Sequence, residues 1–137
     1  MNDLVLARVI AEKAHAGQKY GEEAYTFHLS DVEEQCRAMY GDERTRIVAQ
    51  LHDVLEDTLM TEATLSALFD DDIVKAVVAI TKLKHETREN YLNRCKENEL
   101  ARKVKLADSF CNLKNSLLRY DAGRIARYGK QIAYLVQ

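Results

Sequence analysis

Apolar residues recur every three to four positions along most of this chain, which is the spacing of one face of an α-helix. At the N-terminal end, Leu4, Ala7, Ala11 and Ala14 form such a stripe, and Gly17 follows as a stop signal. No segment sustains the alternation of apolar and polar residues that a half-buried strand shows. The pattern therefore predicts an all-α helical bundle without a β-sheet.

The same spacing, bounded by caps and breakers, predicts where the helices lie. We expect helices over residues 3–16, 29–40, 44–56, 62–68, 73–80, 88–97, 99–118 and 124–135. Residues 17–26 contain two glycines and are expected to form a loop. Thr26 or Ser30 is the expected N-cap of the second helix, and Thr61 and Thr87 are the expected N-caps of two later ones.

Length and composition narrow the class of protein. The chain has 137 residues, no proline and five glycines, so we expect one domain over residues 1–137, with a C-terminal helix within 121–137. A formal net charge of -2 offers no basic footprint for nucleic acid. No apolar run approaches the roughly 20 residues of a membrane span, and no signal peptide is recognisable. The odd, scattered set Cys36, Cys95 and Cys111 is typical of reduced thiols in a cytoplasmic protein.

The densest group of reactive side chains lies within residues 51–58. Four of them carry an imidazole or a carboxylate, namely His52, Asp53, Glu56 and Asp57. On one continuous helix all four would share a broad face, where the carboxylates would repel each other. A divalent cation would relieve that repulsion, and imidazole with carboxylate suits manganese, iron or zinc.

Two residues elsewhere in the chain could complete a metal site. His28 stands at the expected junction of loop and helix, and Asp108 is a charged residue inside an otherwise apolar stripe. A buried carboxylate is costly without a partner, and a metal ion would supply one. Asn112 follows one turn later and would share the face of Asp108. We expect a structural role for His15 and an exposed loop position for His85.

The order of these residues resembles the HD metal-dependent phosphohydrolase superfamily, whose motif is a His, then a His-Asp pair, then an Asp. Further segments extend the resemblance to the (p)ppGpp hydrolase domains of RelA/SpoT-type proteins, including single-domain metazoan SpoT homologues and small alarmone hydrolases. They are Ala14–Gln18, Tyr25 with His28, His52–Thr58, Thr81–Leu83, and Lys105–Asp108 with Asn112. The resemblance covers roughly residues 8–118. A bare His-Asp pair is weak evidence, whereas this longer pattern is specific.

The resemblance implies an HD fold and a role for each matching residue. The residues that would hold the metal, usually Mn²⁺ in this family, are His28, His52, Asp53 and Asp108. Glu56 and Asp57 match the pair that orients or activates the attacking water. Asn112 matches a residue that contacts the nucleotide sugar, and Lys82 and Lys105 match basic positions of the family.

The loop before His28 differs from the family pattern. Alarmone hydrolases usually carry an Arg-Lys pair there, whereas this chain has the shorter stretch Gln18–Gly21 without an arginine. His28 is followed by leucine in place of the usual proline, and Ser109–Cys111 replace the usual Arg-Leu-x. The basic residues expected to screen the leaving diphosphate are Lys19, Lys82, Lys84 and Arg88. Tyr20 and Tyr25 are each expected either to pack within the loop or to stack on a base.

The resulting prediction is a metal-dependent hydrolase that removes 3′-pyrophosphate from (p)ppGpp or a closely similar nucleotide. One alternative is an HD phosphohydrolase acting on another substrate, such as NADPH or a nucleoside phosphate. Another is a non-catalytic module that binds metal or nucleotide, although a mere binder does not need the Glu56–Asp57 pair. The expected partner is a small nucleotide, with no nucleic acid and no membrane. Tyr120, Tyr128 and Tyr134 are candidates for packing or for a homo-oligomer contact.

Overall fold

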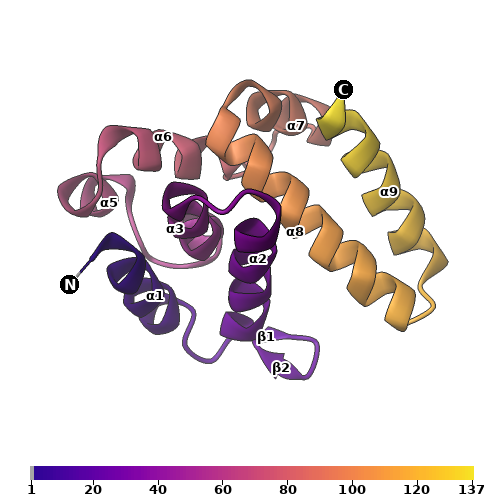
Figure 1. Ribbon diagram of the computed structural model, residues 1–137, viewed down its shortest axis with the longest axis horizontal. Coiled ribbons are helices and arrows are strands. Elements are labelled where there is room, and N and C mark those ends of the chain that lie inside the picture. The colour runs from indigo at the N-terminus through magenta and orange to yellow at the C-terminus, as the bar shows by residue number, and fades with distance from the viewer. Residues whose placement is uncertain (1) are drawn as a thin grey trace.

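The computed structural model describes residues 2–137 and is built almost entirely of helices (Figure 1). The helices are α1 (Asp3–Ala14), α2 (Tyr25–Met39), α3 (Glu43–Leu51), α4 (Val54–Asp57), α5 (Glu62–Leu68), α6 (Asp71–Ile80), α7 (Arg88–Glu97), α8 (Glu99–Leu118) and α9 (Ala122–Val136). The predicted all-α class is confirmed. No helix in this described range combines the length and the apolar character needed to cross a bilayer.

Helix α8 is the element on which most of the others pack. It runs diagonally through the molecule, and α9 returns antiparallel along one side of it (Figure 1). Helices α2, α3, α6 and α7 also contact α8, while α1 packs on α3. Side chains on α2, α3 and α8 can therefore meet in the interior although their positions in the sequence are far apart.

A single hydrophobic core joins the first helix to the last. Leu4 of α1, Val32 of α2, Val48 of α3, Val104 of α8 and Leu135 of α9 all belong to it, and each is buried. A fully buried aliphatic side chain of this size stabilises a fold by about 1.5–3 kcal/mol. This packing holds the three helices that carry the candidate ligands in fixed relative positions.

Several helix ends follow the predicted capping chemistry. The Thr61 hydroxyl accepts a hydrogen bond from the Thr64 amide, and the Thr87 hydroxyl accepts one from the Asn90 amide. Asn98 separates α7 from α8 and caps α8 through the Ala101 amide. The predicted ranges of these two helices and of α5 are confirmed because short polar caps satisfy the amides of the first turn.

The predicted absence of a β-sheet is wrong. Strands β1 (Lys19–Tyr20) and β2 (Glu23–Ala24) pair antiparallel within the expected loop. Gly21 lies at the turn between them with a φ of 62°, a conformation that glycine adopts without strain. Strands of two residues are too short to produce a detectable alternation, so the pattern of apolar positions did not indicate them.

Several other helix boundaries differ from the prediction by one or two residues, and two larger differences affect the candidate site. Helix α2 begins four residues earlier than expected, so Thr26 and Ser30 lie inside it, and its N-cap Ala24 contributes no side-chain hydrogen bond within residues 2–137. The expected helix 44–56 is interrupted, since α3 ends before His52 and a new helical turn starts after Asp53.

The break follows from the chemistry of His52. Its Nδ1 lies 2.6 Å from the Ala49 carbonyl, the acceptor that the Asp53 amide would use in a continuous helix. The interruption turns the His-Asp pair toward α8 and separates it from the carboxylates of α4. The sequence suggested that the four side chains share one helix face, and the break shows that they do not.

Candidate metal centre

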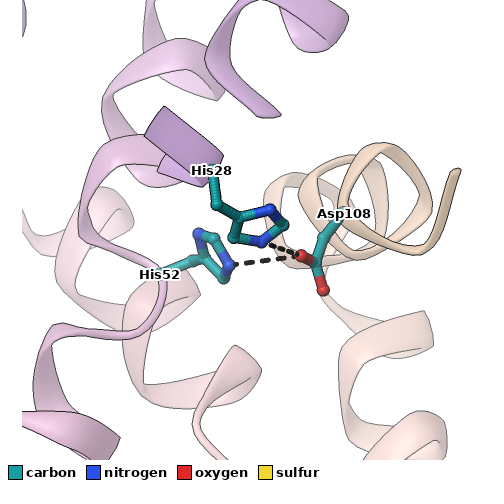
Figure 2. Close-up of side chains that lie close together, drawn as sticks. All are labelled: His28, His52 and Asp108. Carbon is teal, nitrogen blue, oxygen red and sulfur yellow. Dashed lines mark hydrogen bonds and ion pairs between the residues drawn. The ribbon is translucent and has the colours of Figure 1, made fainter. Parts of the chain in front are cut away.

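Three side chains from three helices meet in the interior. His28 comes from the first turns of α2, His52 follows α3, and Asp108 lies midway along α8 (Figure 2). Their ligand atoms all lie within 4.8 Å of one another, and all three residues are buried. This convergence is the one predicted from their order in the sequence.

Both histidines direct Nε2 toward the same carboxylate oxygen. The Asp108 Oδ1 lies 2.9 Å from His28 Nε2 and 3.6 Å from His52 Nε2 (Figure 2). In the neutral form of His52, the bond from Nδ1 to the Ala49 carbonyl leaves the lone pair on Nε2. Within the described chain, that buried Nε2 forms no hydrogen bond. An imidazole lone pair beside carboxylates is the donor set that a divalent cation fits.

The fourth predicted ligand lies at the edge of this group. Asp53 Oδ2 is 3.1 Å from His52 Nε2, and the Tyr25 hydroxyl donates a hydrogen bond to the same oxygen. Tyr25 was expected either to pack in the loop or to stack on a base. Its hydroxyl instead orients the Asp53 carboxylate beside the three converging residues.

The charges of the cluster are those of a cation site. Burial acts to lower the pKa of His52, but the Asp53 and Asp108 carboxylates overcome it and raise that pKa well above its ordinary value. Burial acts to raise the pKa of Asp53, yet His52 holds it at about 2. The pKa of Asp108 is likewise well below its ordinary value, because Lys105 and both histidines outweigh burial. A metal ion would therefore displace a proton held by the imidazole.

Lys105 completes the surroundings of Asp108. Its buried ammonium lies 3.2 Å from Asp108 Oδ2 and stands over the ring of Tyr91, 5.2 Å from the ring centre. The two carboxylate oxygens thus have different partners, Oδ2 with the lysine and Oδ1 with the histidines. The sequence assigned no specific contact to Lys105.

Glu56 and Asp57 lie on the short helix α4, directly after the His-Asp pair. Glu56 Oε1 accepts a hydrogen bond from the Lys82 amide, 3.0 Å away. Burial, reinforced by the Asp53 and Glu56 carboxylates, raises the pKa of Asp57. One acid is thus fixed by the backbone of a neighbouring loop, and the other is a stronger base than an ordinary aspartate.

Two residues of the segment Ala14–Gln18 contact the end of α4 or the residues beside it. The side-chain Nε2 of Gln18 donates a hydrogen bond to the Asp57 backbone carbonyl, 2.8 Å away. The side-chain Oε1 of Gln18 lies 2.8 Å from His15 Nδ1. The His15 ring also packs against Tyr25. These contacts agree with the structural role expected for His15.

A cavity of about 280 Å³ opens onto the cluster, and we call it the inner cavity. It is lined by Tyr20, Tyr25, His28, Asp53, Glu56, Asp57, Lys82, Arg88, Tyr91, Lys105, Asp108, Asn112, Arg124, Arg127 and Tyr128. We call His28, His52, Asp53 and Asp108 the candidate metal cluster. Acidic side chains of this cluster and of α4 line the cavity, and arginines from α7 and α9 supply cationic groups. The cavity is therefore suited to an anionic ligand that also contacts a cation.

The sequence predicted part of this lining. Of the four residues expected to contact substrate, Tyr20, Lys82 and Asn112 line the inner cavity. Lys19 is exposed on β1 and is absent from that lining within the described residues.

Sequence reasoning missed the contribution of α9 to the inner cavity. Arg124, Arg127 and Tyr128 line it, although Tyr128 was expected to serve packing or an oligomer contact. The spacing of these residues over one helical turn was the only available signal, and it is common on any amphipathic helix.

A sequence profile of the HD domain matches residues 7–118. The chain belongs to the HD domain family. The matched range contains all four predicted metal ligands and both acids of α4, and it agrees with the predicted extent of the resemblance. Helix α9 lies outside it, which explains why the motif pattern did not include the arginines of that helix.

Several curated proteins with similar sequences carry names that refer to guanosine nucleotides. The probable guanosine-3′,5′-bis(diphosphate) 3′-pyrophosphohydrolase of Mycoplasma pneumoniae is 43% identical over 58 residues, which cover 42% of this chain and 8% of that protein. The GTP pyrophosphokinase rsh of Brucella ovis is 38% identical over 79 residues, covering 57% of this chain and 10% of that protein. The chain thus spans about a tenth of the length of these curated relatives.

One solved structure is similar over the whole chain. It is described as a metazoan ortholog of SpoT that hydrolyzes ppGpp and plays a role in starvation responses. The two superpose with a TM-score of 0.79 at 23% identity, covering 100% of this chain and 86% of the other. At that identity the likeness establishes a shared fold.

Proposed function

We propose that this HD domain, taken as one unit over residues 1–137, is a metal-dependent phosphohydrolase. Its proposed substrate is (p)ppGpp or a closely similar nucleotide, from which it removes the 3′-pyrophosphate. The observation that carries the proposal is the convergence of His28, His52 and Asp108 around the unpartnered His52 Nε2, beside two further acids. The names of the relatives support the substrate class.

The proposed cofactor is Mn²⁺, held by His28, His52, Asp53 and Asp108. Two imidazole nitrogens with two carboxylates suit a first-row divalent ion of this kind. When bound, such an ion neutralises phosphoryl charge and lowers the pKa of a coordinated water. The remaining steps are assigned to side chains of the chain itself.

Asp57 is the proposed acceptor of the proton that the attacking water loses. Its raised pKa makes it a better base than an ordinary aspartate, and it lies in the wall of the inner cavity. Glu56 is the proposed orienting group, because the Lys82 amide holds one of its oxygens and the other is free to bind water. Hydrolysis then joins the water oxygen to the phosphorus that carries the 3′ oxygen, and the bond between that phosphorus and the 3′ oxygen breaks. Pyrophosphate is released, and the 3′ oxygen takes up a proton to leave a nucleotide that keeps its 5′ phosphates.

The cationic wall opposite the cluster determines how the substrate lies. Arg88 of α7 and Arg124 and Arg127 of α9 present guanidinium groups to the inner cavity. Guanidinium groups bind phosphate oxygens through paired, charge-assisted hydrogen bonds. Phosphates that do not react are therefore proposed to face α7 and α9, with the reacting phosphorus directed toward the metal cluster.

A substrate panel tests the proposal and its alternatives. The protein is incubated with Mn²⁺ and, separately, with ppGpp, pppGpp, NADPH, deoxynucleoside triphosphates and simple phosphoesters. We expect release of pyrophosphate from ppGpp. Turnover of another compound alone would contradict the alarmone substrate and favour a different HD phosphohydrolase. An absence of turnover throughout the panel would contradict an enzyme and favour the binding module.

A cytoplasmic location and a homo-oligomer remain predictions. The three cysteines Cys36, Cys95 and Cys111 are free and buried, as expected for a reducing compartment. For the oligomer, Tyr120 is exposed and available for contact, whereas Tyr128 faces the inner cavity.

A further inference from the structure

Two residues expected to contact the substrate are bonded to each other. The Tyr20 hydroxyl donates a hydrogen bond to Asn112 Oδ1, at 2.5 Å. The ring of Tyr20 also stacks on the imidazole of His28, with ring centres 4.3 Å apart and planes 10° from parallel. Tyr20 thus covers a candidate metal ligand with its face and occupies a polar group of the inner cavity with its hydroxyl.

The orientation of Asn112 makes this contact specific. Its amide nitrogen donates to Asp108 Oδ1, 3.2 Å away, so its carbonyl oxygen must face Tyr20. Asn112 therefore connects the tyrosine hydroxyl to the carboxylate at the centre of the cluster. A ligand group that donates to Asn112 Oδ1 from the position of the Tyr20 hydroxyl has to displace Tyr20.

Tyr20 also separates two cavities. Besides the inner cavity, a second cavity of about 660 Å³ lies along β1, β2 and the end of α8, and we call it the outer cavity. Tyr20 and His28 line both cavities. Pockets for drug-sized ligands span about 300–1,000 Å³. The inner cavity is below that range, so it suits a diphosphate but not a nucleotide with two diphosphates.

The segment that carries Tyr20 is a short hairpin outside the main hydrophobic core. Strands β1 and β2 have two residues each, and a two-stranded hairpin alone is marginally stable in water. At its turn, Gly21 lies so close to the Arg119 guanidinium that a Cβ would overlap it. The hairpin therefore rests on a flexible side chain at the end of α8 and contributes little to the main core.

We propose that Tyr20 is a gate that sets the size of substrate reaching the metal cluster. In the closed position seen here, its hydroxyl is held by Asn112, and a diphosphate enters the inner cavity alone. A nucleotide displaces Tyr20 from Asn112, which joins the two cavities and leaves room for the nucleoside. The proposal rests on the proposed function in taking ppGpp as the large substrate.

The first test separates the hydroxyl from the ring. Tyr20→Phe keeps the stacking surface and removes the bond to Asn112. Dissociation constants for ppGpp and for inorganic pyrophosphate are measured by calorimetry with Mn²⁺, in a Glu56→Gln background that slows turnover. We expect Tyr20→Phe to bind ppGpp about five-fold more tightly, because a net hydrogen bond no longer has to be broken. The affinity for pyrophosphate should stay within two-fold, or about 0.4 kcal/mol.

The other outcomes of this test overturn the gate. Weaker binding of ppGpp would show that the hydroxyl contacts the substrate directly. Equal changes for both ligands, or no change for either, would make Tyr20 a structural residue. Tyr40→Phe is the matched control, since Tyr40 lies at the opposite end of α2 and should change neither constant.

A second test needs no substrate, so it separates failure of the gate from failure of the proposed function. The protein is labelled with fluorotyrosine, and the ¹⁹F resonance of Tyr20 is assigned by its loss in Tyr20→Phe. In Asn112→Ala we expect this resonance to move toward that of Tyr120, which is 92% exposed, while that of Tyr40 stays in place. An unmoved Tyr20 resonance would overturn the gate. If calorimetry shows no binding of ppGpp, the proposed substrate is contradicted. The ¹⁹F shift of Tyr20 then decides by itself whether Tyr20 is a gate.

Discussion

Two buried carboxylates in neighbouring parts of the fold, Glu33 and Asp108, differ in how completely the chain satisfies their surroundings. Glu33 of α2 accepts hydrogen bonds from Arg8, at 2.7 and 2.8 Å, from Gln50, at 2.9 Å, and from Arg46, at 3.0 Å. Its charge is therefore balanced by groups of the chain itself. Asp108 of α8 faces one lysine and two histidines, but a further acid shares this site, and within residues 2–137 the His52 Nε2 forms no hydrogen bond.

The difference shows which cluster is complete. A buried ion pair with every oxygen bonded connects helices and requires nothing from outside, as Glu33 does for α1, α2 and α3. In the Asp108 cluster, His52 Nε2 lies near two carboxylates without forming a hydrogen bond in the described part of the chain, so this nitrogen remains able to coordinate an ion. We therefore interpret the Glu33 cluster as structural and the Asp108 cluster as a binding site, although both consist of charged residues in the interior.

The largest expected effect comes from removing a proposed metal ligand from the Asp108 cluster. Asp53→Ala removes a proposed ligand and should weaken Mn²⁺ binding by at least about 100-fold, with loss of turnover. Calorimetric titration with Mn²⁺ measures this change. Asp71→Ala, a substitution of an exposed aspartate at the start of α6, is the control and should leave Mn²⁺ affinity unaltered. Equal affinity in both variants would contradict the role of Asp53.

The next prediction distinguishes metal binding from the orientation of the attacking water. Glu56→Ala should keep Mn²⁺ affinity within a few-fold and lower kcat by about 10²–10⁴-fold, because the orienting carboxylate is lost. Steady-state kinetics with ppGpp, alongside metal titration, measure the two quantities. Retained activity in this variant would refute the role given to the acids of α4.

The smallest effect tests the structural cluster. Burial acts to raise the pKa of Glu33, but hydrogen bonds from Arg8, Gln50 and Arg46 hold it at about 2, against an ordinary value of 4.5. Glu33→Gln should therefore lower the free energy of unfolding at pH 7 by about 2 kcal/mol, or roughly 7 °C in Tm, because solvent screens part of the interaction. Chemical and thermal denaturation measure the change, and Mn²⁺ affinity should be unaffected.

The pH dependence of this effect has a definite sign. The carboxyl titrates at a lower pH in the folded chain than in the unfolded one, so its stabilisation is complete above about pH 4.5 and is lost as the pH falls toward 2. The stability gap between wild type and Glu33→Gln should close across that window. Glu34→Gln is the matched control, because Glu34 is exposed on the same helix and should have no measurable effect. A gap independent of pH would contradict this account.

The convergence of His28, His52 and Asp108 was predictable from sequence because its evidence is local. A carboxylate within the apolar stripe of α8 and a His-Asp pair after an apolar run each required a partner, and the family order connected them. Other features depend on contacts between distant segments. The bond between Tyr20 and Asn112 joins residues 92 positions apart, and no pattern in either segment indicates it. The break at His52 depends on a side chain bonding the Ala49 carbonyl, which helical periodicity does not report.

The most direct measurement of the central claim is an anomalous difference map from crystals of the protein grown with Mn²⁺. We expect one strong peak in contact with His28 Nε2, His52 Nε2 and an oxygen of Asp108, at the position where these atoms converge in Figure 2. The Glu33 cluster should show no peak. Absence of a peak at the first position, at a concentration that saturates Mn²⁺ binding in solution, would contradict the account.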